Sequence, residues 1–186
     1  MNIEKSIFSQ HGEDGIIEHC INHAAELNKF FFEIGCGFGL ENNTTNLLVK
    51  GWNGIVADLP INIKLYEKLL KAMKYTGNIH KISGVIDSEN IVKLYNEHIT
   101  KILTIDFFSL DIDSYDFFIL QKLLQSNFKP KIICVEYNSF LGNKPITVKY
   151  TKFYKRYDLD PKRGLCYGAS LEAWKMLLQK YNYDFL

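Results

Sequence analysis

Residues 30–40 of this 186-residue chain read FFFEIGCGFGL, an apolar run of strand length that breaks into three glycines. Gly35, Gly37 and Gly39 occupy alternate positions. Glycine lets a backbone turn sharply and approach a ligand closely, because no Cβ blocks the way. In open parallel sheets, ligands bind beyond the carboxyl ends of the strands, where the strand order reverses. The segment therefore predicts a buried strand followed by a ligand-binding turn.

Four further segments are short, rich in Ile, Val or Phe, and apolar at consecutive positions, which is typical of strands that helices cover on both faces. The predicted strands are 30–34, 54–58, 79–85, 107–112 and 131–137. Amphipathic segments of helix length alternate with them, at 13–27, 44–50, 60–75, 90–100, 115–126 and 169–181. This order predicts an α/β fold with a mostly parallel sheet, right-handed crossovers and helices on both faces.

We expect a single domain over residues 1–186, because this length can bury a full core and no linker or repeat divides the chain. It would begin with a helical segment at 1–28. Residues 138–168 lack periodicity, and long irregular segments in compact domains are often binding loops. We predict a substrate loop there, in which Arg156 and Arg163 would bind an anionic or sugar acceptor. A solvated insertion with an ordinary charge run is the alternative.

The composition argues against several classes of protein. A hydrophobic fraction of 47% and a charged fraction of 23% are typical of soluble globular domains. A formal net charge of +1 gives no support to nucleic-acid or acidic-membrane binding. No segment approaches the ~20 apolar residues that span a bilayer, and the first residues lack the apolar stretch of a signal peptide. Four widely spaced cysteines without a C-x-x-C pair predict reduced thiols in a cytoplasmic protein with no structural zinc site.

Acidic residues near the glycines indicate the cofactor. A dinucleotide loop has the pattern G-x-G-x-x-G, whereas the glycines here alternate and Leu40 follows the third. Glu33 would repel a polyphosphate but suits the ammonium group of S-adenosylmethionine. Asp58 ends the second predicted strand and could accept hydrogen bonds from both ribose hydroxyls, with a helix cap as the alternative. S-adenosylmethionine is therefore the favoured cofactor, with the loop contacts Gly35, Cys36, Gly37 and Gly39.

Further acidic and amide residues follow the other predicted strands. Asp87 could lie near the adenine, although capping the next helix explains it equally well. Asp111 and Glu136 end otherwise apolar strands, where burying a carboxylate is costly, so we predict that they orient the substrate or act as general base. Asp111 is also a candidate cofactor contact. We predict that Asp113 and Asn138 bind the substrate, with a loop or cap role as the alternative for Asp113.

The motifs together resemble those of the class I S-adenosylmethionine-dependent methyltransferases, and within them the FkbM-like family. The matches in chain order are SQHGEDG at 9–15, EIGCGFG at 33–39, NTTN at 43–46, GWNG at 51–54, LDID at 110–113, PKIICVEYN at 130–138 and YGASL at 167–171. The resemblance implies a Rossmann-like fold that acts mainly on small molecules or glycans, commonly on a hydroxyl oxygen. It implies that Glu33, Gly35, Gly37 and Asp58 contact the cofactor. It also implies that His11, a candidate base or a surface histidine, lies near the mouth of the site.

The chain departs from this family at its end. The family's sheet has seven strands, the last two forming an antiparallel pair, and the sequence stops at 183–186, where the sixth strand would begin. We therefore expect part of this hairpin to be missing. Either the sequence is a piece of a longer protein, or a partner such as a second copy covers the exposed sheet edge.

The leading functional prediction is O-methylation of a small molecule, sugar or surface glycan. A divalent metal could be held by the same oxygens. It is not favoured, because Glu136-Tyr137-Asn138 does not reproduce the adjacent acid–amide pair of metal-dependent catechol-type methyltransferases. One alternative function is a nicotinamide-dependent oxidoreductase, which the glycine spacing disfavours. The other is a non-catalytic module that keeps the methyltransferase fold and requires a second chain.

Overall fold

The computed structural model describes residues 3–99, 104–151, 162 and 164–186. The chain divides into two compact units, each built from segments that are far apart in the sequence. The first unit contains Met1–Ile86, Lys101–Leu110 and Lys129–Cys134. The second unit contains Asp87–Thr100, Asp111–Phe128 and Val135–Leu186. The single domain expected from the sequence stays a prediction.

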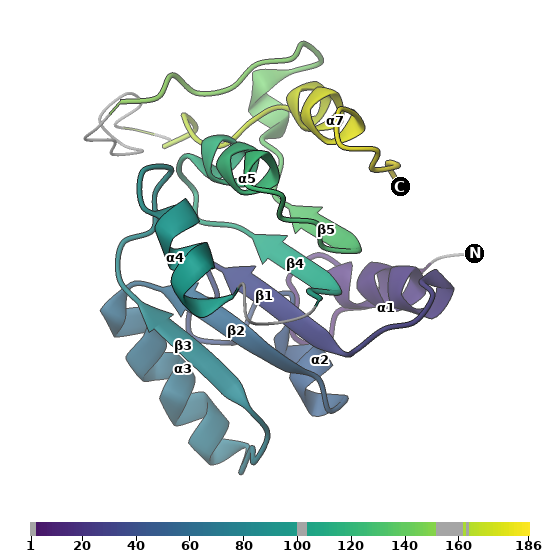
Figure 1. Cartoon of the computed structure of the whole chain (residues 1–186), viewed down its shortest axis with the longest axis vertical. Helices are drawn as coiled ribbons and strands as arrows, with labels where there is room; N and C mark the ends of the chain where they lie inside the picture. The colour runs from purple at the N-terminus through teal and green to yellow at the C-terminus, as the bar shows by residue number, and fades with distance from the viewer. Residues whose placement is uncertain (1–2, 100–103, 152–161, 163) are drawn as a thin grey trace. The chain divides into compact units, whose positions relative to one another are not determined.

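A five-stranded sheet in the order β3-β2-β1-β4-β5 forms the centre of the first unit (Figure 1). Its strands are β1 (Phe30–Ile34), β2 (Asn53–Asp58), β3 (Ile79–Ser83), β4 (Phe107–Leu110) and β5 (Ile132–Val135). β1 pairs in parallel with β2 and β4, and β2 pairs in parallel with β3. All five predicted strands are confirmed, although the last three end earlier than expected. The strand order reverses beside β1, so the glycine loop lies where open sheets bind their ligands.

The strand side chains are buried on both sides of the sheet. Phe31, Val56 and Phe107 share one core cluster with residues of α1 (Glu13–His23), α2 (Thr45–Val49) and α3 (Pro60–Ala72). The alternate strand residues, among them Phe32 and Phe108 with ring centroids 5.3 Å apart, are equally buried. Burial of both sets explains why these strands are apolar at consecutive positions.

The N-terminal segment is folded around the buried carboxylate of Asp14, at the start of α1. Its Oδ2 accepts hydrogen bonds from the N–H groups of Ile7, Phe8 and Ser9 at 2.7, 2.7 and 2.8 Å. Burial alone would raise the pKa of Asp14, but these hydrogen bonds hold it below its usual range. The predicted helix is confirmed but ends at His23, because the next residue is extended.

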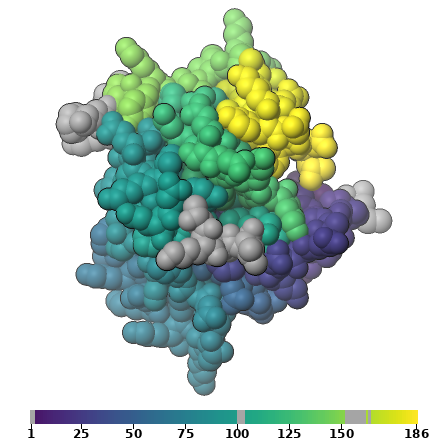
Figure 2. Space-filling model, in the orientation of Figure 1, coloured from purple at the N-terminus to yellow at the C-terminus, as the bar shows by residue number. Residues whose placement is uncertain are grey.

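The second unit contains α4 (Ile91–His98), α5 (Asp116–Gln125), η1 (Ser139–Leu141) and α7 (Leu171–Gln179). Figures 1 and 2 show α7, in yellow, beside the green segment that includes α5. The contact is built on Trp174, whose ring lies 5.3 Å from that of Phe117. The Trp174 Nε1–H donates to the backbone oxygen of Glu136 at 2.9 Å, so α7 fixes the backbone that carries this acid.

Part of the predicted substrate loop, residues 138–168, is more ordered than its sequence suggests. Its first residue, Asn138, is buried and donates both amide hydrogens, to the backbone oxygens of Leu165 (2.7 Å) and Tyr167 (3.0 Å). An antiparallel bridge joins Thr147 to Ala169. Asn138 thus holds the two ends of the loop together, and its substrate contact stays a prediction. Arg156 and Arg163 lie outside the described residues.

Within the described part of the chain, residues 180–186 form no strand and the sheet has five strands. Among the described helices, none has the length and hydropathy that crossing a membrane requires. The partner predicted to cover the sheet edge and the cytoplasmic location both stay predictions.

Candidate functional site

The glycine loop after β1 meets the end of β2 through one short hydrogen bond. Gly35, Gly37 and Gly39 have positive φ angles of 88°, 54° and 86°, in the region that glycine adopts at little cost. The Gly37 N–H donates to Asp58 Oδ2 at 2.7 Å. A Cβ at Gly37 would meet nothing within 4 Å, so the backbone here faces open space. This is the geometry that close approach of a ligand requires.

Asp58 joins the loop to the start of α3. Its Oδ1 accepts from the N–H of Leu59 at 2.6 Å and from the side chain of Asn62 at 2.9 Å. Asp58 therefore bonds residues at the start of α3 in addition to Gly37, but the N-cap of α3 is Leu59, with no side-chain cap hydrogen bond. A carboxylate offers about four acceptor positions, and the three bonds named here leave one for a ribose hydroxyl.

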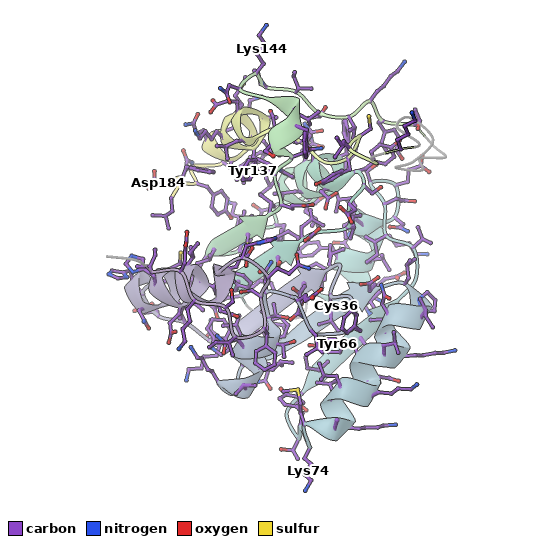
Figure 3. All side chains as sticks on the ribbon, turned by 180° about the vertical axis from the view of Figure 1, so that it is seen from behind. Cys36, Tyr66, Lys74, Tyr137, Lys144 and Asp184 are labelled. Carbon is purple, nitrogen blue, oxygen red and sulfur yellow. The ribbon has the colours of Figure 1, made fainter. Side chains whose placement is uncertain are left out.

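Two of the loop residues expected to contact the cofactor have packing roles. A Cβ at Gly39 would lie 2.5 Å from Leu69 and 2.7 Å from Tyr66, so glycine is needed for close packing against α3. The Cys36 side chain is fully buried in the core cluster that includes Tyr66, and Figure 3 shows the two residues together. Burial raises the pKa of the Cys36 thiol far above its ordinary value, which is typical of an inert structural cysteine. A cofactor contact from either residue stays a prediction.

Glu33 is only 2% exposed, and the segment before α2 encloses its carboxylate. Its Oε1 accepts from the Asn43 N–H at 3.1 Å. Its Oε2 accepts from the Asn42 side chain at 2.9 Å and from the Thr44 hydroxyl. Glu33 therefore stabilises this segment, whereas the predicted contact with a cofactor ammonium group stays a prediction.

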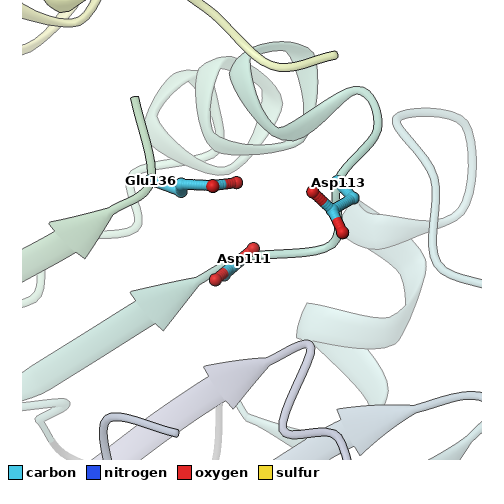
Figure 4. Close-up of side chains that lie close together, drawn as sticks. All are labelled: Asp111, Asp113 and Glu136. Atoms are coloured by element: carbon cyan, nitrogen blue, oxygen red, sulfur yellow. The ribbon is translucent and has the colours of Figure 1, made fainter. Parts of the chain in front are cut away.

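A second candidate site, the acidic cluster of Asp111, Asp113 and Glu136, lies in the second unit (Figure 4). One carboxylate oxygen of each residue lies within 4.8 Å of the others. Burial, and then the negative charges of Asp111 and Asp113, raise the pKa of Glu136 to about 8. The surroundings of Glu136 therefore favour its protonated form more than water would. The structure brings together the acids that the sequence places after β4 and β5.

Asp116, which the sequence reasoning missed, shapes the loop of the acidic cluster. It is buried, and its two carboxylate oxygens accept from the N–H groups of Ile112 at 2.8 Å and Ser114 at 3.0 Å. These bonds fix the loop that carries Asp111 and Asp113, the latter with a positive φ of 54°. The available sequence signal was the position of Asp116, two residues after Ser114 and four after Ile112. From such a position an aspartate can accept hydrogen bonds from the backbone of a turn.

Tyr167 makes another contact with the acidic cluster, one that no local sequence pattern indicates. Its hydroxyl donates to Glu136 Oε1 at 3.3 Å, although the two residues are 31 positions apart in the sequence. The YGAS motif thus brings a phenol to the acidic cluster. Ser170, the last residue of this motif, is the N-cap of α7, and its side chain accepts from the Ala173 N–H at 3.2 Å.

The other predicted residues have local partners. His11 is exposed, and its backbone N–H donates to the Glu13 carboxylate at 2.7 Å. Asp87 accepts from the N–H groups of Glu89 and Asn90 at 2.8 and 2.9 Å, in the turn before α4, whose N-cap is Asn90. The adenine contact of Asp87, the catalytic role of His11 and the cofactor contact of Asp111 stay predictions.

The donor set of the acidic cluster fits a hard divalent cation, since Mg²⁺ and Ca²⁺ take carboxylate oxygens as ligands. Asp111, Asp113 and Glu136 would be the residues that hold it. The side-chain oxygen of Asn138, the atom that could bind a metal, already accepts from the N–H of Phe140 at 3.0 Å. Any metal here would therefore depend on the three carboxylates.

Comparison with known proteins gives a likeness in structure alone. No family model and no curated protein matches the sequence. The carbon methyltransferase CurJ matches with a TM-score of 0.52 and 14% identity, over 92% of this chain and 46% of that one. An O-methyltransferase family protein from Burkholderia thailandensis matches at 0.49 and 10%, over 93% and 52%. The mitomycin 7-O-methyltransferase MmcR matches at 0.45 and 16%, over 91% and 48%.

The chain spans about half the length of these three solved structures. At 14% identity, the CurJ match shows a shared fold. The parallel sheet with the order β3-β2-β1-β4-β5 is accordingly a Rossmann-like sheet of the methyltransferase type.

Proposed function

We propose that this chain is an S-adenosylmethionine-dependent methyltransferase of the FkbM-like kind, which O-methylates a small molecule, a sugar or a surface glycan. The observation that carries the proposal is the pairing of Gly37 with Asp58 at the carboxyl ends of β1 and β2. The loop backbone is open to a ligand at this point, and the carboxylate keeps an acceptor position for a ribose hydroxyl. The shared fold with a known methyltransferase supports the same assignment.

The acids divide into different chemical roles under this proposal. Methyl transfer is an in-line displacement from a sulfonium carbon, so positioning supplies much of the rate, and a hydroxyl acceptor also needs a base. The pKa of Glu136 is raised to about 8, which favours a role as hydrogen-bond donor over that of general base. Asp111, which is exposed, and His11 are the other candidate bases.

Isothermal titration with S-adenosylhomocysteine tests the cofactor site through two matched glycines. Gly37 and Gly51 both have positive φ, and a Cβ at either would meet nothing within 4 Å. Valine at either position costs similar backbone strain, but only at Gly37 would it intrude on the proposed ligand. We expect Gly37→Val to weaken binding about tenfold or more, equivalent to ~1.4 kcal/mol, and Gly51→Val to leave binding unchanged.

Two outcomes would contradict the proposal. If the folded wild-type protein does not bind S-adenosylhomocysteine, the cofactor assignment is wrong. If it binds NADH tightly in a fluorescence titration, the site belongs to an oxidoreductase.

A further inference from the structure

We infer that Glu33 is a positioning residue, which fixes the glycine loop through residues 42–45 and does not itself touch the ligand. The inference rests on the proposed function and assigns a different role to the acid that the sequence alone would place against the cofactor ammonium. We call Glu33 with residues 42–45 and Ser109 the polar brace. All its members lie in the first unit.

The first part of the polar brace is the enclosure of the Glu33 carboxylate. Three donors from consecutive residues, Asn42, Asn43 and Thr44, reach its two oxygens. Asn42 and Thr44 are themselves buried. Buried polar groups are normally hydrogen-bonded, and these donors depend on Glu33 for that. The carboxylate therefore acts as the fixed point around which the segment folds.

The second part connects this segment to the glycine loop. The fully buried Thr45 donates its hydroxyl to the backbone oxygen of Gly39 at 2.6 Å. The Thr45 N–H donates to the Asn42 side chain at 3.2 Å. A continuous chain of hydrogen bonds thus runs from Glu33 through Asn42 and Thr45 to Gly39, two residues after the open position of the loop.

The third part ties the polar brace to the neighbouring strand. The Asn43 side chain donates to the hydroxyl of Ser109, which is buried on β4. Ser109 is the residue that pairs with Glu33 across β1 and β4. The brace therefore spans the two strands between which the sheet order reverses, where small displacements of the loop would alter ligand binding.

Tyr66 fills the space beneath the loop. Its ring packs against Gly39, and its buried hydroxyl has no hydrogen-bond partner in the part of the chain that the structure describes. Burial, and then the charge of Glu33, raise the pKa of Tyr66. The Gly39 backbone is thus held between this ring and the Thr45 hydroxyl.

Two ligands distinguish a positioning role of Glu33 from direct contact between Glu33 and the cofactor. S-adenosylhomocysteine carries the amino-acid group with its ammonium, whereas 5′-methylthioadenosine has the same adenosine and lacks that group. If Glu33 contacts the ammonium, Glu33→Gln weakens only the binding of S-adenosylhomocysteine. If Glu33 positions the loop, Glu33→Gln weakens the binding of both ligands by the same factor.

Thr45→Val provides the second variant, because valine keeps the shape and removes the hydroxyl. We expect Thr45→Val to weaken both ligands about fivefold, the factor that one lost hydrogen bond typically carries. We also expect faster amide hydrogen exchange over residues 36–45. The matched control is Thr151→Val, which removes a hydroxyl that lies 2.6 Å from the Tyr115 hydroxyl in the second unit and should change neither result.

The outcomes separate this inference from the proposed function. Loss of S-adenosylhomocysteine binding alone in Glu33→Gln would overturn the positioning role. If the wild type binds neither ligand, the proposed function is wrong, but hydrogen exchange in Thr45→Val still decides whether the brace holds the loop. If Glu33→Gln does not fold, Thr45→Val decides, and unchanged exchange over residues 36–45 would overturn the inference.

Discussion

Glu33 and Glu136 are both placed at the carboxyl ends of strands, β1 and β5, and they have opposite surroundings. Glu33 is enclosed by donors from Asn42, Asn43 and Thr44. Glu136 faces the carboxylates of the acidic cluster, with Tyr167 as a donor on one oxygen. In the sequence the two acids look alike, because Glu33 is the penultimate residue of one apolar strand and Glu136 directly follows another.

The difference teaches what a buried carboxylate can do. Donors satisfy the oxygens of a buried carboxylate, so an acid enclosed by them becomes a structural anchor. Burial and neighbouring carboxylates destabilise the charged form, which raises the pKa of Glu136 and would favour its neutralisation by a proton or a cation. The arrangement around Glu136 is therefore the one that responds to pH or to a bound cation.

The largest effect is expected when Glu33 is replaced by its neutral isostere, glutamine. The corresponding change at Asp113 in the acidic cluster is the comparison. Glu33→Gln would direct an amide group at buried donors and leave some of them unsatisfied, which should lower the free energy of unfolding by about 3 kcal/mol. Asp113→Asn removes a repulsive charge from the exposed side of the acidic cluster and should change stability by no more than about 0.5 kcal/mol. Urea denaturation measures both, and equal losses would show that the two regions do not differ in this way.

An intermediate effect is expected from Asp116, the donor-enclosed acid next to the acidic cluster. Asp116→Ala strands the N–H groups of Ile112 and Ser114, so we expect a loss of about 2 kcal/mol in urea denaturation. Glu172→Ala, which removes a partly exposed ion pair with Lys175, is the control and should cost only roughly 0.3 kcal/mol. A loss as small as that of the control would mean that these backbone bonds do not stabilise the loop.

The remaining effect is the pH dependence that Glu136 adds to stability, which shows as a slope with pH and not as a loss at one pH. Its folded pKa of about 8 lies above the ordinary 4.5, so the proton favours the folded state. This contribution is complete below about pH 4.5 and is lost as the pH rises through about 8. Glu136→Gln should therefore flatten the fall of the melting temperature between roughly pH 5 and pH 9. Glu97→Gln, on the exposed face of α4, is the control and should leave the slope of melting temperature against pH unchanged. An unchanged slope in Glu136→Gln would mean that a group other than Glu136 causes the pH dependence.

The sequence by itself determined the order of strands and helices and the position of the glycine turn. These features are local, since burial on both faces imposes consecutive apolar residues and positive φ at Gly35 and Gly37 suits glycine. The acids at the ends of β4 and β5 were also visible, because carboxylates after apolar strands stand out. The lengths of the elements were less certain, and α1 and β3 end earlier than their sequence patterns predict.

Only the tertiary structure decided what each acid does. The enclosure of Glu33, the bond between Gly37 and Asp58, and the contact of Tyr167 with Glu136 join residues about ten to thirty positions apart. Gly39 likewise owes its identity to Tyr66 and Leu69 on α3. The charge state and exposure of a carboxylate depend on which groups the fold brings within hydrogen-bonding distance, and that set cannot be read from neighbours in the sequence.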